Sequence, residues 1–171
     1  MWVQEYQRGK PLAKAKKVGS ARDHGTTITF EPDTTIFTTT DFNLDTILHH
    51  LRQQAYLTKG ILVTVIDQRD SERPPQPFAF YFEGGVASYV RHLNHAKEPK
   101  HDSVFYVSKE IDGVAVEVAV QYTDEYKDTV FAFTNNIYNP EGGTHLVGFR
   151  SALTRVLNNY ARAKNYLKEK D

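Results

Sequence analysis

The chain has 171 residues, with 21 Lys and Arg, 21 Asp and Glu and no Cys, so its formal net charge is zero. This balance gives no general attraction for nucleic acid, and the lack of Cys excludes disulfides, thiolate metal sites and a cysteine nucleophile. No apolar run approaches the roughly 20 residues that span a bilayer, and the N-terminus lacks the apolar core of a signal peptide, so we expect a cytoplasmic protein without membrane association.

The N-terminal part predicts two strands joined by a basic connection. Residues 2–7 alternate large apolar with polar side chains, and residues 25–31 are dense in β-branched side chains, which favours extended structure in both. The connection at residues 10–22 combines Lys and Arg with Gly. A solvated loop is a simpler interpretation of this composition than a nucleic-acid patch.

A helix and a covered strand are predicted next. Five apolar residues at three- and four-residue steps form the buried stripe of the helix: Leu44, Ile47, Leu48, Leu51 and Ala55. The pair Lys59-Gly60 ends this helix. Residues 61–66 are almost continuously apolar, which predicts a central strand covered on both faces. A polar, proline-rich loop at 67–77 leads to a further strand at 78–82.

A glycine pair at 84–85 is the predicted domain boundary, and a short helix at 86–95 follows it. The pair Asp112-Gly113 is favoured in a two-residue type I′ turn, so it predicts a β-hairpin. After the turn, valines alternate with other residues over 114–122. This pattern predicts a strand with one valine face.

The C-terminal region predicts a last strand at 129–133, the third of an antiparallel set, followed by a long helix that Thr144 caps. Its apolar stripe should be buried and consists of Leu146, Phe149, Leu153, Val156, Leu157, Tyr160 and Leu167. At helical spacing Arg155 and Arg162 lie nearly opposite this stripe, and Arg150 lies on its flank. Arginines projecting from one helix suit phosphate contact, although a solvated cationic face is the simpler interpretation.

The most specific motif runs from TNNI to GGTHLVGFRSALTRVLNNYA at residues 134–161, and further blocks precede it at 24–33, 47–70, 80–94 and 104–124. In the same order, these blocks resemble the ATPase subunit of type IIA DNA topoisomerases, the gyrase B and ParE families. The resemblance covers nearly the whole chain. It implies an α+β fold, with residues 1–84 as the C-terminal part of a GHKL ATPase α/β sandwich and residues 85–171 as the N-terminal part of a ribosomal protein S5 domain 2-like transducer.

The resemblance also implies a function, the coupling of ATP binding and hydrolysis to DNA strand passage and supercoiling or relaxation. Gly25 and Thr26 match the family's Gly-Thr at the nucleotide pocket, and Arg150 and Arg155 match its DNA-cavity block. The family's catalytic base, Mg²⁺-binding Asn and lid lie upstream of these blocks, so no catalytic residue is expected here. ATP and Mg²⁺ would be bound mainly by other regions, and this stretch alone should be inactive.

The implied partners are DNA, a gyrase A-like or ParC-like cleavage protein, and a second copy of the ATPase gate. No metal site is predicted, because the histidines lack the spacing of motifs such as H-E-x-x-H: His49, His50, His92, His95, His101 and His145. The alternative is a stand-alone, non-catalytic module with an S5-like fold that binds nucleic acid or protein. The neutral net charge counts against strong non-specific binding of nucleic acid by such a module.

Overall fold

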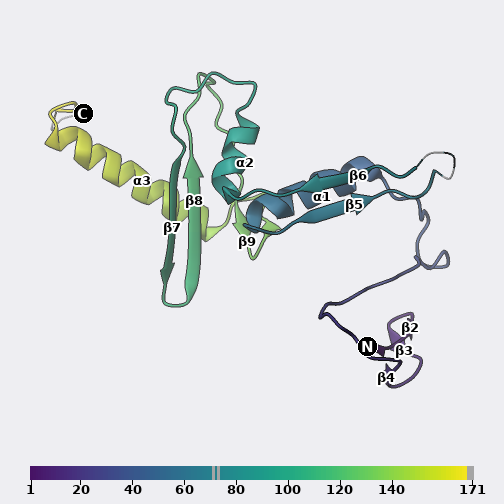
Figure 1. Ribbon diagram of the computed structural model, residues 1–171. Coiled ribbons are helices and arrows are strands. Elements are labelled where there is room, and N and C mark those ends of the chain that lie inside the picture. The colour runs from purple at the N-terminus through teal and green to yellow at the C-terminus, as the bar shows by residue number, and fades with distance from the viewer. Residues whose placement is uncertain (71, 73, 169–171) are drawn as a thin grey trace. The chain divides into compact units, whose positions relative to one another are not determined.

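The computed structural model describes residues 1–70, 72 and 74–168 (Figure 1). By its backbone contacts the chain divides into two units, residues 1–43 and the chain from residue 44 onward. Helices and antiparallel strands are mixed along the chain, as an α+β fold requires. No helix in the described residues is long and apolar enough to cross a membrane.

The first unit holds two small antiparallel pairs. Strand β1 (Trp2–Val3) pairs with β4 (Lys16–Lys17), and β2 (Tyr6–Gln7) pairs with β3 (Lys10–Pro11). The single strand predicted at 2–7 is therefore two short ones. Arg8 and Gly9 form the β2–β3 turn with φ of 50° and 77°.

The prediction of a strand at residues 25–31 was wrong, because this segment is extended without being part of a sheet. Its β-branched residues favour the extended conformation, but a strand also needs a neighbour for its backbone N–H and C=O groups. No described segment pairs with it. Ile28 and Phe30 are accordingly 82% and 71% exposed.

The second unit begins with helix α1 (Leu44–Leu57), strands β5 (Val63–Ile66) and β6 (Pro77–Phe80), and helix α2 (Gly85–Leu93). Both helices confirm the sequence prediction. The buried stripe of α1 packs on the β5–β6 pair, and the core consists of Leu48, Ala55 and Phe80 with Leu44, Leu51, Val63, Val65 and Phe82 around them. The prediction that the 61–66 strand is central and covered on both faces was wrong, since β5 pairs only with β6 among the described strands and alternates exposed and half-buried residues.

The hairpin predicted around Asp112-Gly113 is confirmed: β7 (Phe105–Ile111) pairs with β8 (Val114–Val120) in register across this turn. Both turn residues have the positive φ of a type I′ turn, 52° and 77°. The prediction of a third strand at 129–133 was also wrong. Strand β9 (Phe133–Thr134) begins only at its end and pairs with β10 (Ile137–Tyr138) instead of extending the β7–β8 sheet.

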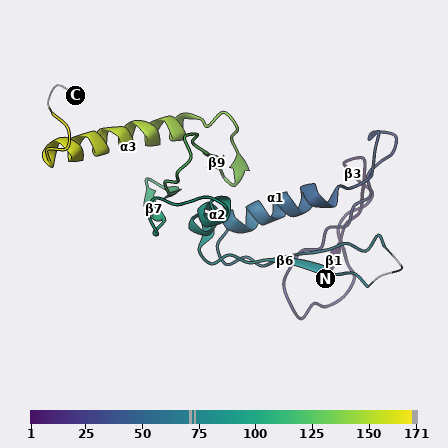
Figure 2. The same ribbon diagram turned by 90° about the horizontal axis from the view of Figure 1, so that it is seen from above.

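The C-terminal helix α3 (Thr144–Ala163) is confirmed, but its predicted cap and burial were wrong. The N-cap is Gly143, with φ of 88° and no capping side chain, and Thr144 is the first helical residue. No residue of α3 is buried; Leu146, Phe149 and Leu153 are half-buried, whereas the stripe residues from Val156 to Tyr160 are exposed. Figures 1 and 2 both show the C-terminal part of α3 clear of the other elements of the second unit, so no described element of this unit covers this part of the stripe.

Candidate functional site

The residues assigned to ligands from the sequence lie in different units. Gly25 and Thr26 are exposed in the extended segment of the first unit, and Arg150 and Arg155 are exposed on α3. Arg150 Nη2 pairs with Asp128 Oδ2 at 2.8 Å, and both side chains are more than half exposed. An ion pair in such surroundings contributes little stability, so the guanidinium is available to an anion.

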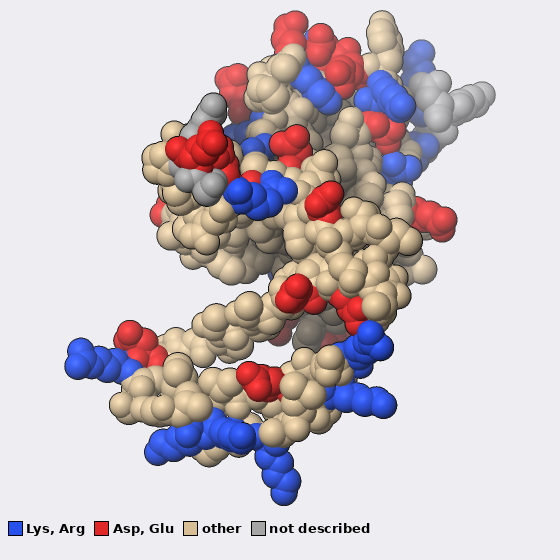
Figure 3. Space-filling model, turned by 90° about the vertical axis from the view of Figure 1, so that its right-hand side faces the viewer, with Lys and Arg blue, Asp and Glu red and all other residues tan. Residues whose placement is uncertain are grey.

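Basic and acidic side chains are mixed on the face that Figure 3 draws. Lys and Arg side chains project along the lower rim of this face. All basic residues of the first unit are exposed: Arg8, Lys10, Lys14, Lys16, Lys17 and Arg22. The connection is exposed throughout, as the sequence indicated, but it is not all loop, because it contains strands β3 and β4.

Several side-chain contacts of the second unit converge on the C-terminal end of α1. We call residues 53–59 and the side chains that they contact beyond residue 84 the α1 junction. One part of it is aromatic: the ring of Tyr56 stacks on Phe82 with centroids 3.6 Å apart and lies 5.0 Å from the ring of Tyr89 on α2. Gln53 Nε2 donates a hydrogen bond of 3.0 Å to the Tyr89 hydroxyl. Tyr56 and Tyr89 are only 5% and 8% exposed, so they fasten α1 to α2.

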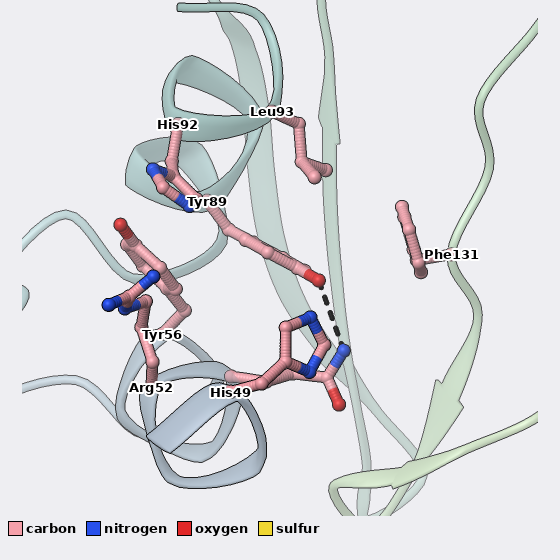
Figure 4. Close-up of a pocket in the computed structure, with 8 residues that line it drawn as sticks. His49, Arg52, Tyr56, Tyr89, His92, Leu93 and Phe131 are labelled. Carbon is pink, nitrogen blue, oxygen red and sulfur yellow. Dashed lines mark hydrogen bonds between the residues drawn. The ribbon is translucent and has the colours of Figure 1, made fainter. Parts of the chain in front are cut away.

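A small hollow opens beside this aromatic stack (Figure 4). Its volume is about 80 Å³, and it is lined by His49, Arg52, Gln53, Tyr56, Tyr89, His92, Leu93 and Phe131. Ligand pockets usually enclose some 300 Å³ or more, so this hollow has no room for a nucleotide. Burial, followed by the nearby positive charge of Arg52, lowers the pKa of His92 and favours its neutral form.

A second part of the junction is the turn between β9 and β10. Asn135 and Asn136 have φ of 49° and 64°, a left-handed conformation that Asn tolerates better than most residues. Gln54 Nε2 donates to the Asn136 carbonyl oxygen at 3.0 Å, and Asn136 Nδ2 donates to Thr58 Oγ1 at 3.0 Å. The turn is thus held against the last turn of α1 by bonds from both its backbone and its side chain.

The third part is a charged group that we call the Lys59 cluster: Lys59, Tyr106 and Glu117. Lys59 Nζ lies 3.0 Å from Glu117 Oε1, donates to the Tyr106 hydroxyl, and lies 4.3 Å from the centroid of the Tyr106 ring. The Tyr106 hydroxyl donates in turn to Glu117 Oε1 at 2.6 Å. The cluster joins the loop after α1 to both strands of the β7–β8 hairpin.

The electrostatic surroundings favour the charged forms of two groups of the Lys59 cluster, the Lys59 ammonium and the Glu117 carboxylate. Hydrogen bonds, first with Tyr106 and then with Glu117, raise the pKa of Lys59. Partial burial alone would raise the pKa of Glu117, but its bonds from Tyr106 and Lys59 together outweigh burial and lower it. Both groups are therefore ionised at neutral pH, and the pair is held by charge-assisted bonds.

The junction is a set of contacts between the end of α1 and later elements of the chain. No group of three or more His, Asp or Glu in the described residues could hold a metal ion. The bonds of the junction run from the end of α1 to three successive elements beyond residue 84: α2, the β7–β8 hairpin and the β9–β10 turn. A displacement of α1 would therefore disturb its contacts with each of these three elements.

A family model described as DNA gyrase B matches residues 85–171. The chain belongs to the DNA gyrase B family. The DNA gyrase B protein of Bacillus mycoides is 44% identical over 169 residues, which cover 98% of this chain and 41% of that protein. The DNA gyrase B protein of Clostridium acetobutylicum is 44% identical over 172 residues, covering 100% of this chain and 26% of that protein.

Solved structures agree with this family membership. The 43K ATPase domain of Thermus thermophilus gyrase B, in complex with an aminocoumarin, is 31% identical with a TM-score of 0.80, covering 99% of this chain and 46% of that one. The gyrase B protein of Myxococcus xanthus, at 22% identity and a TM-score of 0.77 over 94% of this chain and 46% of that one, shares the fold. The α+β fold predicted from the resemblance is confirmed, whereas the position of the domain boundary at 84–85 stays a prediction.

Membership of the gyrase B family favours the topoisomerase interpretation over a stand-alone binding module. The chain spans 41% and 26% of the length of these two curated relatives, so it corresponds to only part of a gyrase B protein. Asn135 and Asn136 lie within the family motif, and the resemblance assigns them no role, although consecutive Asn is itself a signal for a left-handed turn. Lys59 was interpreted only as a helix end, and nothing in its spacing pointed to Tyr106 or Glu117.

Proposed function

We propose that this chain acts within the ATPase subunit of a gyrase B-like type IIA DNA topoisomerase and couples ATP binding and hydrolysis to DNA strand passage, with supercoiling or relaxation as the result. The observation that carries the proposal is the α1 junction, whose bonds run from the end of α1 to elements on the far side of residue 84. Residues 1–84 belong to the end of the GHKL ATPase domain in this proposal, and residues 85–171 begin the transducer. The junction is then the mechanical link between them.

At the nucleotide end, Gly25 and Thr26 contribute to the ATP site. Their exposure in an extended segment supports this assignment, since the Thr hydroxyl and the glycine backbone are open to a ligand. A solved relative is an ATPase domain, which supports ATP as the nucleotide. Most contacts with ATP and Mg²⁺ belong to other parts of the full protein, and the 171-residue chain on its own should show no Mg²⁺-dependent ATP hydrolysis. Turnover by the pure chain would contradict this assignment.

At the DNA end, Arg150 and Arg155 contact phosphates. Both are exposed on α3, and guanidinium groups stay charged and can bind two phosphate oxygens at once. These contacts position DNA without reading its sequence. The remaining partners in this proposal are a gyrase A-like or ParC-like cleavage protein and a second copy of the ATPase gate, in the cytoplasm.

The test uses the complete gyrase B-like protein together with its cleavage partner. Wild type should supercoil DNA, or relax it faster, when ATP is supplied, and Arg150→Gln should lower DNA-stimulated ATP turnover about fivefold, equivalent to about 1 kcal/mol of lost phosphate contact. Arg162→Gln is the matched control, because Arg162 lies in the last turn of α3, where a cation serves the helix dipole. Strand passage that ATP leaves unchanged in both rate and direction would contradict the proposed function, and unchanged stimulation in Arg150→Gln would remove Arg150 from DNA contact.

A further inference from the structure

The aliphatic part of Lys59 lies directly over the backbone of Gly85, the first residue of α2. A Cβ atom built on Gly85 would come within 2.6 Å of Lys59 Cε and 2.7 Å of Lys59 Cγ, closer than real Cβ contacts. Gly85 also has φ of 53°, a conformation that favours glycine. The absence of a side chain at residue 85 is therefore what lets Lys59 reach the β7–β8 hairpin.

The position of the ammonium group is fixed from several directions. The backbone leaves α1 at Leu57 and turns at Gly60, whose φ is 75°, so Lys59 is held at the turn between the helix and β5. Its Nζ then meets a carboxylate and a phenol that stand on two different strands. A displacement of α1 relative to the hairpin would separate charges that are 3.0 Å apart.

The other contacts of the junction allow more adjustment. The aromatic contacts of Tyr56 are non-directional in part, and stacked rings tolerate sliding. The Asn136 bonds end on a turn between two very short strands. The Lys59–Glu117 bond joins opposite charges on two exposed residues, and its charge-assisted geometry depends more directly on the distance between Nζ and Oε1.

We propose that Lys59 is a positioning residue that locks the end of α1 to the β7–β8 hairpin, so that the nucleotide state sensed on the α1 side is converted into movement of the hairpin. This proposal rests on the proposed function and names the residue that carries the coupling. Lys59 touches neither nucleotide nor DNA in this role. Its loss uncouples strand passage from ATP hydrolysis without abolishing hydrolysis itself.

The activity test replaces Lys59 in the complete gyrase B-like protein, in complex with its cleavage partner. Lys59→Met keeps the aliphatic part over Gly85 but removes the charge. The number of strand-passage events per ATP hydrolysed should fall at least about fivefold, the lower range of allosteric coupling energies, with DNA-independent hydrolysis within about twofold of wild type. Lys59→Arg should restore most of the ratio, and Lys59→Met combined with Glu117→Gln should be no worse than Lys59→Met alone.

The matched control is Lys97→Met. Lys97 Nζ pairs with Glu125 Oε2 at 2.7 Å, and both residues lie on the same side of residue 84. This control removes an equivalent ion pair that does not reach α1. A coupling ratio that falls equally in both variants, or in neither, would overturn the role given to Lys59.

A second measurement is independent of activity. Hydrogen exchange of backbone amides in the β7–β8 hairpin should be faster in Lys59→Met than in wild type or in Lys97→Met, because the hairpin loses its bond to the end of α1. If wild type shows no ATP-dependent strand passage, the proposed function fails, and the exchange experiment still decides whether Lys59 restrains the hairpin. Equal exchange in all three proteins overturns the inference even when the enzyme is active.

Discussion

Helices α1 and α3 have the same kind of apolar pattern but different surroundings. In α1 the stripe is matched by strands β5 and β6 and by α2, and Leu48, Ala55 and Tyr56 are buried. In α3 no residue is buried, and Val156 and Tyr160 are 60% and 55% exposed. Periodicity therefore predicts where a helix forms and which face is apolar, whereas the burial energy depends on a partner that periodicity does not specify.

The largest expected difference between the two helices comes from truncating one tyrosine in each. Tyr56→Ala should lower the free energy of unfolding by about 3–5 kcal/mol, because it empties a buried site and removes stacking on Phe82 and Tyr89. Tyr160→Ala should cost less than about 1 kcal/mol, since its ring is already in solvent. Urea denaturation of both variants measures the two losses. Similar losses would mean that the stripe of α3 is also covered in solution.

A smaller difference, of opposite sign, is expected from adding one methyl group to a glycine in α2 and one in α3. Gly85→Ala should destabilise by about 1–2 kcal/mol, because Gly85 is left-handed and Lys59 occupies the space of a Cβ atom. Gly148→Ala, inside α3 with no atom near its Cβ position, should stabilise by about 0.5–1 kcal/mol through the higher helix propensity of Ala. Thermal unfolding of the two variants gives both signs. A stabilising Gly85→Ala would contradict the packing of Lys59 over α2.

The smallest effect expected is a pH dependence of stability from His92, which lies on α2 with its ring against Tyr56 of α1. Burial lowers the pKa of His92 below its usual value of 6.5, with Arg52, His95 and His49 adding positive charge around it. The folded state therefore binds a proton less readily than the unfolded chain does, and the stability contributed by neutral His92 is present above pH 6.5 and is lost as the pH falls below it.

Urea midpoints at about pH 7.5 and about pH 5.5, on either side of the ordinary His pKa, test this dependence. Wild type should lose stability on acidification, and His92→Gln should lose less. His145→Gln is the control, because it makes the same exchange at an exposed position of α3. A wild-type difference retained in full by His92→Gln would assign the pH dependence to other groups.

The elements that the sequence predicted well are those whose formation depends on residues close by in the sequence. Helices α1, α2 and α3 follow from apolar spacing, and the β7–β8 hairpin follows from Asp112-Gly113. The strands expected at 25–31 and 129–133 did not form as predicted, because a strand also requires a partner that propensity does not identify. Residues 61–66 were likewise predicted to be a central strand from their apolar side chains, but β5 pairs only with β6 among the described strands.

The candidate site was predictable only where a local signal existed. The resemblance supplied Gly25, Thr26, Arg150 and Arg155, and their roles stay predictions. The Lys59 cluster had no such signal, since Lys59 and Tyr106 are 47 positions apart and each is ordinary in its own segment. Such contacts appear only when the fold brings the segments together.

The hydrogen bond between Gln54 and Asn136 joins residues 82 positions apart, which bears on the order in which the chain folds. The β7–β8 hairpin closes over a two-residue turn, and such hairpins form in microseconds, whereas long-range contacts wait for the closure of large loops. We therefore expect the hairpin to form early and the α1 junction to be among the last contacts made. Pulsed hydrogen exchange during refolding should protect β7 and β8 before the end of α1, and simultaneous protection would contradict this sequence of events. Synthesis from the N-terminus makes α1 first, yet Asn136, the partner of Gln54, becomes available only after 82 further residues have been added.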